Sequence, residues 1–208
     1  MTGYAGVAEQ QVHAAPEVLG HLEQDPKMAA LVETFGPYSW PLSPPFRSLV
    51  RAVVGQLISG AAARATFNRL EAATHIEPER ILGRTIDDLL ALGVPRRKGE
   101  YLHGLSRYAL DGNLDDLTEL SDADVTARLV ALRGVGVWTA EMFLIFALGR
   151  PDVWPLKDIG VVRAAERYYD LSNIAEVEAL GERFRPHRSA AVWYLWRWIE
   201  ANPGRAKK

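Results

Sequence analysis

Apolar residues recur with a helical period along nearly the whole chain, and this periodicity restricts the fold more than any other feature. Between Arg47 and Ile58 they follow a repeat of about 3.6 residues, as one buried face of a helix requires. The residues concerned are Leu49, Val50, Val53, Val54, Leu57 and Ile58. We find no long alternating segment and no tight Asn-Gly turn, the main signals of strands. The sequence therefore predicts an all-α fold with two helical lobes and a cleft between them.

Polar residues mark where two further helices begin. Thr85 and Asp88 have the spacing of a capping box, in which each side chain accepts a hydrogen bond from the other residue's backbone amide. Asn173 stands in the same relation to Glu176. Prolines at positions 41, 44 and 45 indicate a linker. We therefore expect an N-terminal helical segment, residues 1–45, that packs on a core of residues 46–208.

Composition excludes several kinds of chemistry. The 208 residues include no cysteine, so disulfides, thiolate zinc sites, iron–sulfur clusters and a cysteine nucleophile are all ruled out. No apolar run is long enough to span a membrane and no signal peptide is visible, so a cytoplasmic protein is expected. The formal net charge of −2 gives no indication of nucleic-acid binding. The basic cluster from Arg96 to Lys98 is equally well explained as a solvated helix face.

The most informative segment runs from Leu132 to Ala140. One helix is expected to end near Leu132 and another to begin near Val137, with Gly134 and Gly136 in the turn between them. Glycine tolerates positive φ and a close backbone approach, and amides at a helix N-terminus bind anions such as a DNA phosphate. A simple turn between helices explains the two glycines about as well. A dinucleotide site would need a preceding strand and a third glycine.

An ordered set of motifs surrounds this hairpin. Upstream lie the apolar helix that begins near Phe46, a Gln-x-x-Ser turn at Gln56–Ser59 and a loop at residues 92–98. Downstream lie a loop at residues 149–155 and then Asp158. The set resembles the helix-hairpin-helix (HhH-GPD) DNA glycosylase superfamily, of the 3-methyladenine DNA glycosylase II type, from about residue 40 to the C-terminus. The resemblance implies a base excision repair enzyme that hydrolyses the N-glycosidic bond of an alkylated base flipped out of duplex DNA.

By resemblance, Asp158 is the catalytic carboxylate. It would stabilise the oxocarbenium-like transition state that forms when the bond from C1′ to the base breaks. Without the resemblance, Asp158 is an ordinary helix N-cap, and the two roles are compatible. Asp152 is the rival carboxylate, which we interpret as a loop residue. Lyase members of the family carry a lysine where this chain has Trp138, and Lys157 is not at that position, so a monofunctional enzyme without lyase activity is expected.

The resemblance also assigns residues that contact DNA. Leu57 would be the wedge that fills the gap left by the extruded base, with Gln56 near the opposite base. The alternative is that Leu57 is a core residue, because it belongs to the apolar stripe. Phosphate contacts are expected at the hairpin: Arg133, Gly134, Val135, Gly136, Val137 and Thr139. Arg133 replaces the usual proline, and its side chain either contacts phosphate or is only solvated.

The base pocket is expected to use aromatic stacking on a positively charged lesion. Trp138 stands at one pocket position, although a buried core tryptophan is the alternative. Met142 replaces an expected tyrosine and His187 an expected tryptophan, which leaves the damage spectrum open. Trp154, Trp193 and Trp196 are interpreted as core residues. No cofactor is expected, except for a Na⁺ or K⁺ ion held by backbone carbonyls near Leu132 and Val135, which the family often binds.

The expected partner is double-stranded DNA that contains damaged bases, bound by a monomer in the cytoplasm in association with the nucleoid. No membrane association and no additional N-terminal β-domain are expected. Two alternatives stay open. One is a helix-hairpin-helix module that binds DNA without chemistry, although such a module has no need of Asp158. The other is a glycosylase for an oxidised or mispaired base.

Overall fold

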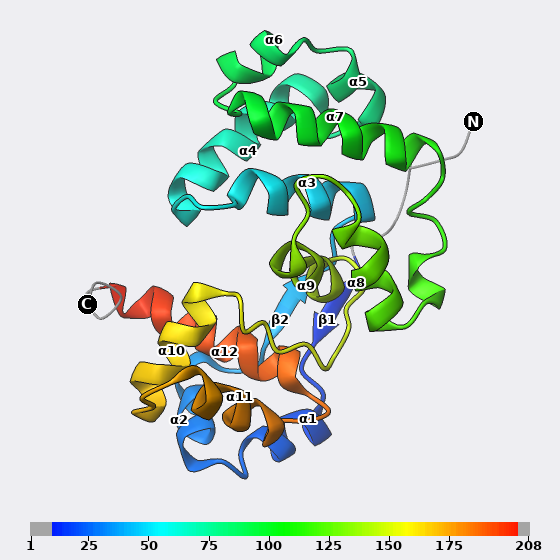
Figure 1. Ribbon diagram of the computed structural model, residues 1–208. Coiled ribbons are helices and arrows are strands. Elements are labelled where there is room, and N and C mark those ends of the chain that lie inside the picture. The colour runs from blue at the N-terminus through cyan, green and yellow to red at the C-terminus, as the bar shows by residue number, and fades with distance from the viewer. Residues whose placement is uncertain (1–9, 204–208) are drawn as a thin grey trace. The chain divides into compact units, whose positions relative to one another are not determined.

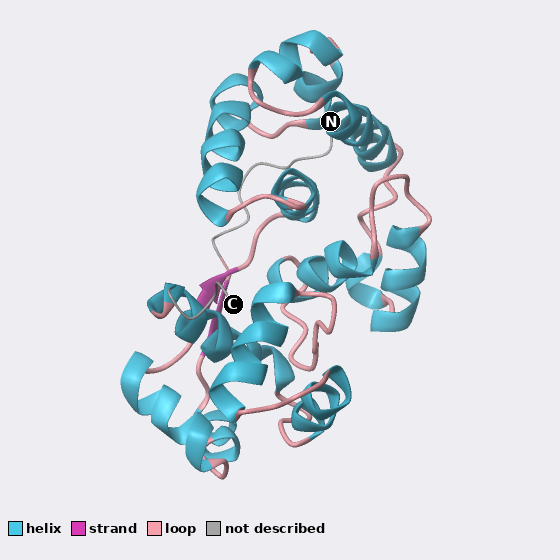
Figure 2. Ribbon diagram, turned by 60° about the vertical axis from the view of Figure 1, so that its left-hand side comes forward, coloured by secondary structure: helices cyan, strands magenta, loops and turns pink. Residues whose placement is uncertain are grey.

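The computed structural model of the protein describes residues 10–203. Twelve α-helices make up most of this part of the chain, and two strands of three residues each form a small sheet (Figures 1 and 2). The prediction of an all-α fold is therefore confirmed. The sequence did not predict the strands, because each is too short to show an alternating pattern.

The chain is organised as two compact units with a discontinuous boundary. One unit combines the segment up to Leu42 with the segment from Gly149 onward, and the other is Ser43–Leu148. This division differs from the sequence-based one. The N-terminal segment groups with the segment from Gly149 onward, whereas the sequence-based division packed it on a single core of residues 46–208.

The first unit is built around its last helix, α12, Arg188–Ala201, which packs against α2, Pro26–Phe35, and α10, Ile159–Tyr169. Tyr194 of α12 is fully buried, and its hydroxyl donates to the carbonyl of Gly36 at 2.9 Å. The remaining elements are β1, Gln11–His13, α1, Pro16–Leu22, β2, Ser39–Pro41, and α11, Ile174–Glu182. The two strands pair antiparallel, with Val12 opposite Trp40.

The second unit is built around α3, Pro45–Gly55, which packs against α4, α7 and α9. Its Leu49, Val50 and Val53 are fully buried, as the apolar period predicts. The remaining helices are α4, Gly60–Thr74, α5, Pro78–Leu82, α6, Ile86–Ala91, α7, Arg96–Leu110, α8, Asp122–Val130, and α9, Val137–Phe146. A short 3₁₀ helix, Leu117–Glu119, precedes α8.

The helix starts predicted from polar residues are confirmed. Thr85 and Asp88 form a capping box at α6, and the Asn173 side chain accepts from the amide of Glu176 at α11. These contacts are local in sequence, so the sequence alone could predict them. Among residues 10–203, every helix is too short or too polar to cross a bilayer.

Candidate active site

Helix α3 ends earlier than the apolar stripe predicts. It stops at Gly55, and Leu57 adopts a left-handed conformation with φ of 58°. The Leu57 side chain is 100% exposed, so the alternative that it is a core residue is wrong. The next helix explains the early end, because Ser59 caps α4 by accepting from the amide of Ala62. Only a turn of three residues, residues 56–58, therefore joins α3 to that cap.

Two side chains hold this turn, which we call the Leu57 turn (residues 56–59). The ammonium of Lys98 donates to the carbonyls of Val54 and Gln56, both at 2.8 Å. The Gln56 side-chain amide donates to the carbonyl of Gly134 at 2.9 Å and to the Thr139 hydroxyl at 3.0 Å. The Gln56 side chain therefore connects the Leu57 turn to the glycine hairpin. Its expected place beside the base opposite the lesion stays a prediction.

The glycine hairpin has the predicted helix boundaries, with α8 ending at Val130 and α9 beginning at Val137. Gly134 has a φ of 90°, and a Cβ on it would overlap the ring of Tyr101, so only glycine fits there. Gly136 has a φ of −106° as the N-cap of α9, so it does not use the positive φ that glycine permits. No side chain caps that end of α9, and a Cβ on Gly136 would meet nothing within 4 Å. The start of α9 is thus open to an anion.

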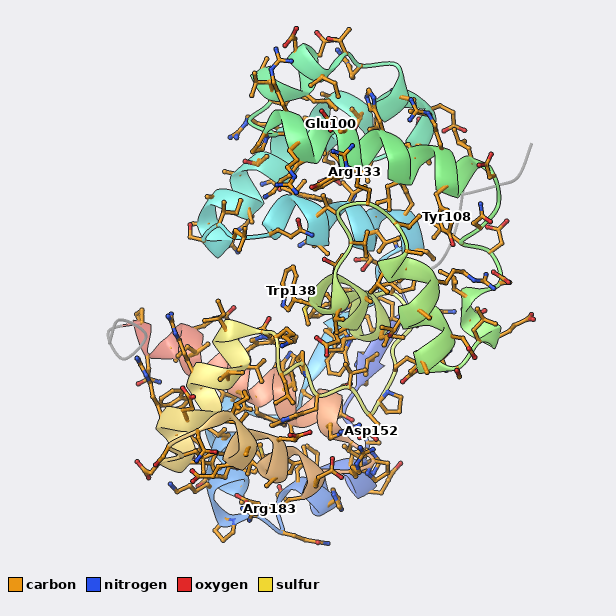
Figure 3. The ribbon with its side chains drawn as sticks, viewed as in Figure 1. Glu100, Tyr108, Arg133, Trp138, Asp152 and Arg183 are labelled. Atoms are coloured by element: carbon orange, nitrogen blue, oxygen red, sulfur yellow. The ribbon has the colours of Figure 1, made fainter. Side chains whose placement is uncertain are left out.

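Arg133 lies on the exposed side of the hairpin. Its side chain is 77% exposed and pairs with Glu100 at 3.5 Å; both residues are labelled in Figure 3. Its guanidinium carbon also lies 5.9 Å from the centre of the Tyr101 ring, and that of Arg97 lies 5.7 Å from the same ring. An exposed ion pair contributes at most about 1 kcal/mol, so Arg133 can exchange Glu100 for a phosphate at little cost.

Two of the three expected pocket residues share one face of α9. Trp138 lies in its first turn and is half-buried (Figure 3), and Met142 follows one turn later with 7% exposure. Thr139, which the hairpin assignment also includes, is buried at 1% exposure and accepts from Gln56. Trp138 and Met142 therefore lie on a common face of α9, and their contact with a base stays a prediction.

Asp158 is the N-cap of α10 and is 9% exposed. Its Oδ1 accepts from the amide of Val161 at 2.8 Å and from the indole Nε1 of Trp196 at 3.4 Å. A Cβ on Gly160 would lie 3.0 Å from that same oxygen, so a larger residue would crowd the carboxylate. The carboxylate is therefore held by both a backbone amide and an aromatic donor. Trp196, interpreted from the sequence as core, is half-buried beside it.

Asp152 is engaged in an ion-pair network on the surface of the first unit. Its carboxylate accepts from Arg188 Nε at 2.6 Å and from Arg185 Nη1 at 2.9 Å, and Arg188 also donates to its backbone carbonyl. Glu182 contacts the same two arginines. This network fixes the loop before Asp158 to the start of α12, which agrees with the interpretation of Asp152 as a loop residue.

His187 lies apart from Asp158 within the first unit. Its ring packs against that of His21, with 5.4 Å between centroids, and lines a cavity of about 60 Å³ together with Trp40. Trp196, the neighbour of Asp158, is nine residues further along α12, a rise of about 13 Å. The structure therefore does not bring His187 and Asp158 together. Trp154 is a core residue at 8% exposure, as predicted, and donates to the Val177 carbonyl.

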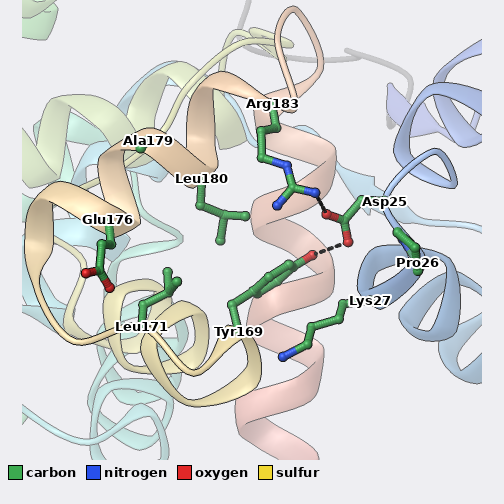
Figure 4. A pocket seen from close by; sticks show the side chains of 9 residues that line it. All are labelled: Asp25, Pro26, Lys27, Tyr169, Leu171, Glu176, Ala179, Leu180 and Arg183. Carbon is green, nitrogen blue, oxygen red and sulfur yellow. Dashed lines mark hydrogen bonds and ion pairs between the residues drawn. The ribbon is translucent and has the colours of Figure 1, made fainter.

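A larger cavity of about 520 Å³ lies among α2, α10 and α11 and contains none of the predicted site residues (Figure 4). Asp25 is its central polar group and is buried, capping α2 at the amide of Met28. It also accepts from the Tyr169 hydroxyl at 3.1 Å and pairs with Arg183. Burial raises the pKa of Tyr169 well above its usual range. Asp25 thus serves to join three elements of the fold. Among the described residues, no group of His, Asp and Glu could hold a metal ion.

The fold and the hairpin together define a helix-hairpin-helix protein, and comparison with known proteins identifies the family. The model of the HhH-GPD superfamily base excision DNA repair protein matches residues 50–186. The chain belongs to this superfamily.

Individual relatives agree with this assignment. An alkylbase DNA glycosidase-like protein of Schizosaccharomyces pombe is 29% identical over 83% of this chain and 87% of its own length. The structure of a 3-methyladenine DNA glycosylase of Schizosaccharomyces pombe in complex with abasic DNA superposes with a TM-score of 0.82. It has 30% identity and covers 88% of this chain and 97% of its own. A DNA-3-methyladenine glycosidase of Bacillus halodurans gives a TM-score of 0.75 at 30% identity, covering 94% of each chain.

Proposed function

We propose that the protein is a monofunctional DNA glycosylase that removes alkylated bases from double-stranded DNA. The observation that carries this proposal is the Asp158 carboxylate, held at the N-terminus of α10 by the Val161 amide and the Trp196 indole. The names of the relatives supply the substrate class, because they are glycosylases of alkylated bases. A module that only binds DNA backbone has no use for a carboxylate, which phosphate repels.

The proposed reaction replaces the bond from C1′ to the base nitrogen with a bond from C1′ to the oxygen of water. The bond from C1′ to the base breaks, and its electron pair stays on the base nitrogen, so a cationic alkylated purine leaves as a neutral base. The sugar then carries positive charge, which the Asp158 carboxylate stabilises. Water adds to C1′ and gives up its proton, for which Asp158 is the acceptor. The positive end of the α10 dipole lies at Asp158 and attracts its negative charge.

DNA binding is assigned to the second unit. The open start of α9 after Gly136 receives a phosphate, and Arg133 adds a cation beside it. Leu57 enters the duplex in place of the extruded base. Trp138 stacks on the cationic base, and Met142 below it supplies a polarisable thioether instead of a second ring. A pocket to which α9 contributes Trp138 and Met142, rather than two aromatic rings, is expected to accept lesions of several shapes.

A Na⁺ or K⁺ ion at the hairpin fits the backbone there. The Leu132 carbonyl accepts from the amide of Val135 at 3.0 Å. A carbonyl oxygen has two lone pairs, so this one can still coordinate a cation. The ion would supply positive charge next to the amides that meet the phosphate. The residues that would hold it are Leu132 and Val135, through their backbone oxygens.

A base-release assay tests the proposed function. Duplex oligonucleotides that each carry one defined lesion, such as 3-methyladenine, 7-methylguanine or ethenoadenine, are incubated with the protein, and the freed base is identified by mass. Release of at least one alkylated base is expected, with undamaged DNA as the control. Release of only an oxidised or mispaired base would move the protein to another glycosylase class, and DNA binding without release would make it a binding module.

The proposed absence of lyase activity predicts that borohydride traps no covalent complex with DNA. A Schiff base needs an amine at the sugar, and Trp138 occupies the hairpin position where lyase members carry lysine. Reactions with borohydride and with salt alone are compared by denaturing electrophoresis, with a lyase-type glycosylase as the positive control. A trapped adduct would refute the proposal, and its loss in Lys157→Ala would identify the amine beside Asp158 as its source.

A further inference from the structure

The Leu57 turn has a conformation that its own sequence does not favour. Leu57 has a positive φ, which is costly for a residue with a Cβ, and its side chain gains nothing from burial at 100% exposure. Local capping by Ser59 explains where α4 begins but not why residue 57 takes this shape. Contacts from elsewhere in the second unit must therefore stabilise the turn.

Lys98 supplies the main contact of this kind. It lies in the first turn of α7, half-buried, and its ammonium joins the carbonyls of Val54 and Gln56 on either side of the end of α3. The carbonyls of a last helical turn have no partner within the helix, and a cation there also complements the helix dipole. Burial lowers the pKa of Lys98 from its usual range. The Lys98 side chain therefore contacts the backbone inside the second unit, whereas the neighbouring Arg96 and Arg97 are exposed to solvent.

From this geometry we infer that Lys98 is a positioning residue for base extrusion, which presets the Leu57 turn before DNA binds. The inference rests on the proposed function, in which Leu57 is the wedge. Lys98 touches neither base nor sugar in this role. By fixing the Gln56 carbonyl it also orients the Gln56 side chain, which connects the turn to Gly134 and Thr139 of the hairpin. Lys98 and Gln56 therefore connect the wedge to the phosphate-binding hairpin through hydrogen bonds.

A wedge matters only where a stacked base must be displaced, and this gives a specific test. Single-turnover excision is measured for wild type and Lys98→Met on the same lesion in duplex and in single-stranded DNA. We expect the variant to lose roughly tenfold in duplex, a loss that corresponds to about 1.4 kcal/mol. In single strands its rate is expected to stay within about twofold of wild type, since no stacked partner must be replaced. Lys98→Arg, which can rejoin the two carbonyls, is expected to recover most of the duplex rate.

Arg96→Met is the matched control. It removes a cation from the same helical turn, and Arg96 pairs with Asp87 on the surface. It is expected to leave both rates unchanged. An equal loss on duplex and single strands in Lys98→Met would overturn the positioning role. The positioning role would also be overturned if Lys98→Met reduced the magnitude of the slope of log DNA affinity against log salt concentration by about one. Such a change would mean that Lys98 contacts a DNA phosphate.

A second measurement does not depend on activity. Amide hydrogen exchange at residues 56–59 is expected to speed up in Lys98→Met while the melting temperature changes little. If the protein excises no base at all, the proposed function fails, and this exchange result still decides whether Lys98 holds the turn. If Lys98→Met does not fold, Lys98→Gln replaces it, because glutamine keeps a donor while removing the charge. Unchanged exchange in a folded variant would refute the inference.

Discussion

Replacing Asp158 with asparagine is expected to lower the rate of base excision by roughly a hundredfold to a thousandfold, the usual effect of removing one preorganised electrostatic group. Asparagine is isosteric but neutral, so the developing charge on the sugar loses its counterion and the attacking water loses its base. Asparagine caps helices about as well as aspartate, so the free energy of unfolding is expected to fall by less than about 1 kcal/mol. DNA affinity should stay equal or rise, because one repulsion of phosphate disappears.

Single-turnover excision, thermal melting and binding to lesion-containing duplex together measure these effects. Asp25→Asn is the matched control, because Asp25 is also a buried N-cap in the first unit. It should destabilise the fold more than Asp158→Asn does, since Asp25 also pairs with Arg183. It should nevertheless keep excision at temperatures below its own transition. Normal excision by Asp158→Asn would remove this carboxylate from the mechanism.

Leu57→Ala is expected to slow excision from duplex DNA by roughly tenfold to a hundredfold. This estimate takes about 1.5–3 kcal/mol for the apolar surface that Leu57 would bury in the duplex, at 1.4 kcal/mol for each factor of ten. The folded protein should lose almost nothing, because the side chain is 100% exposed. A change in unfolding free energy within about 0.5 kcal/mol is expected, as for surface residues in general.

Excision kinetics and melting temperature are compared with those of Leu90→Ala, an exposed leucine of α6 in the same unit. That control should leave both quantities unchanged. A drop in melting temperature for Leu57→Ala with excision intact would mean that Leu57 contributes to the fold and not to extrusion.

The end of α3 shows what the sequence could not predict about the site. The apolar period continues through Leu57 and Ile58 and by itself predicts a helix to Ile58, whereas the Gln-x-x-Ser motif placed a turn at Gln56–Ser59. Beyond the end of α3, the turn is held by Lys98, which lies 42 residues along the chain from Gln56, and by the contact of the Gln56 side chain with Gly134. Lys98 itself looked like part of a solvated basic cluster. Only the folded backbone shows which of three consecutive basic residues points inward.

Features that depend on neighbours in the sequence were predicted well. The hairpin boundaries and the caps at Thr85 and Asn173 arise within a few residues, and so does the N-cap geometry of Asp158. The pairing of β1 with β2 joins segments on opposite sides of two helices, and no local pattern announces it. Likewise, the neighbourhood of Asp158 and Trp196 depends on how α12 packs against α10.

The discontinuous first unit has a consequence for how the chain is made. Residues 43–148 form a unit that is continuous along the chain, so all of its segments are present once Leu148 has been synthesised. The earlier helix α2, Pro26–Phe35, packs against α12, Arg188–Ala201, which is synthesised about 150 residues later. Synthesis proceeds at about 5–20 residues per second, so roughly ten to thirty seconds pass between the synthesis of α2 and that of α12. The face of α2 that α12 covers includes the buried residues Met28 and Leu31. During this interval the apolar face of α2 is exposed to chaperones and to other chains. Slower elongation would prolong this exposure and favour aggregation, and would therefore lower the yield of folded protein.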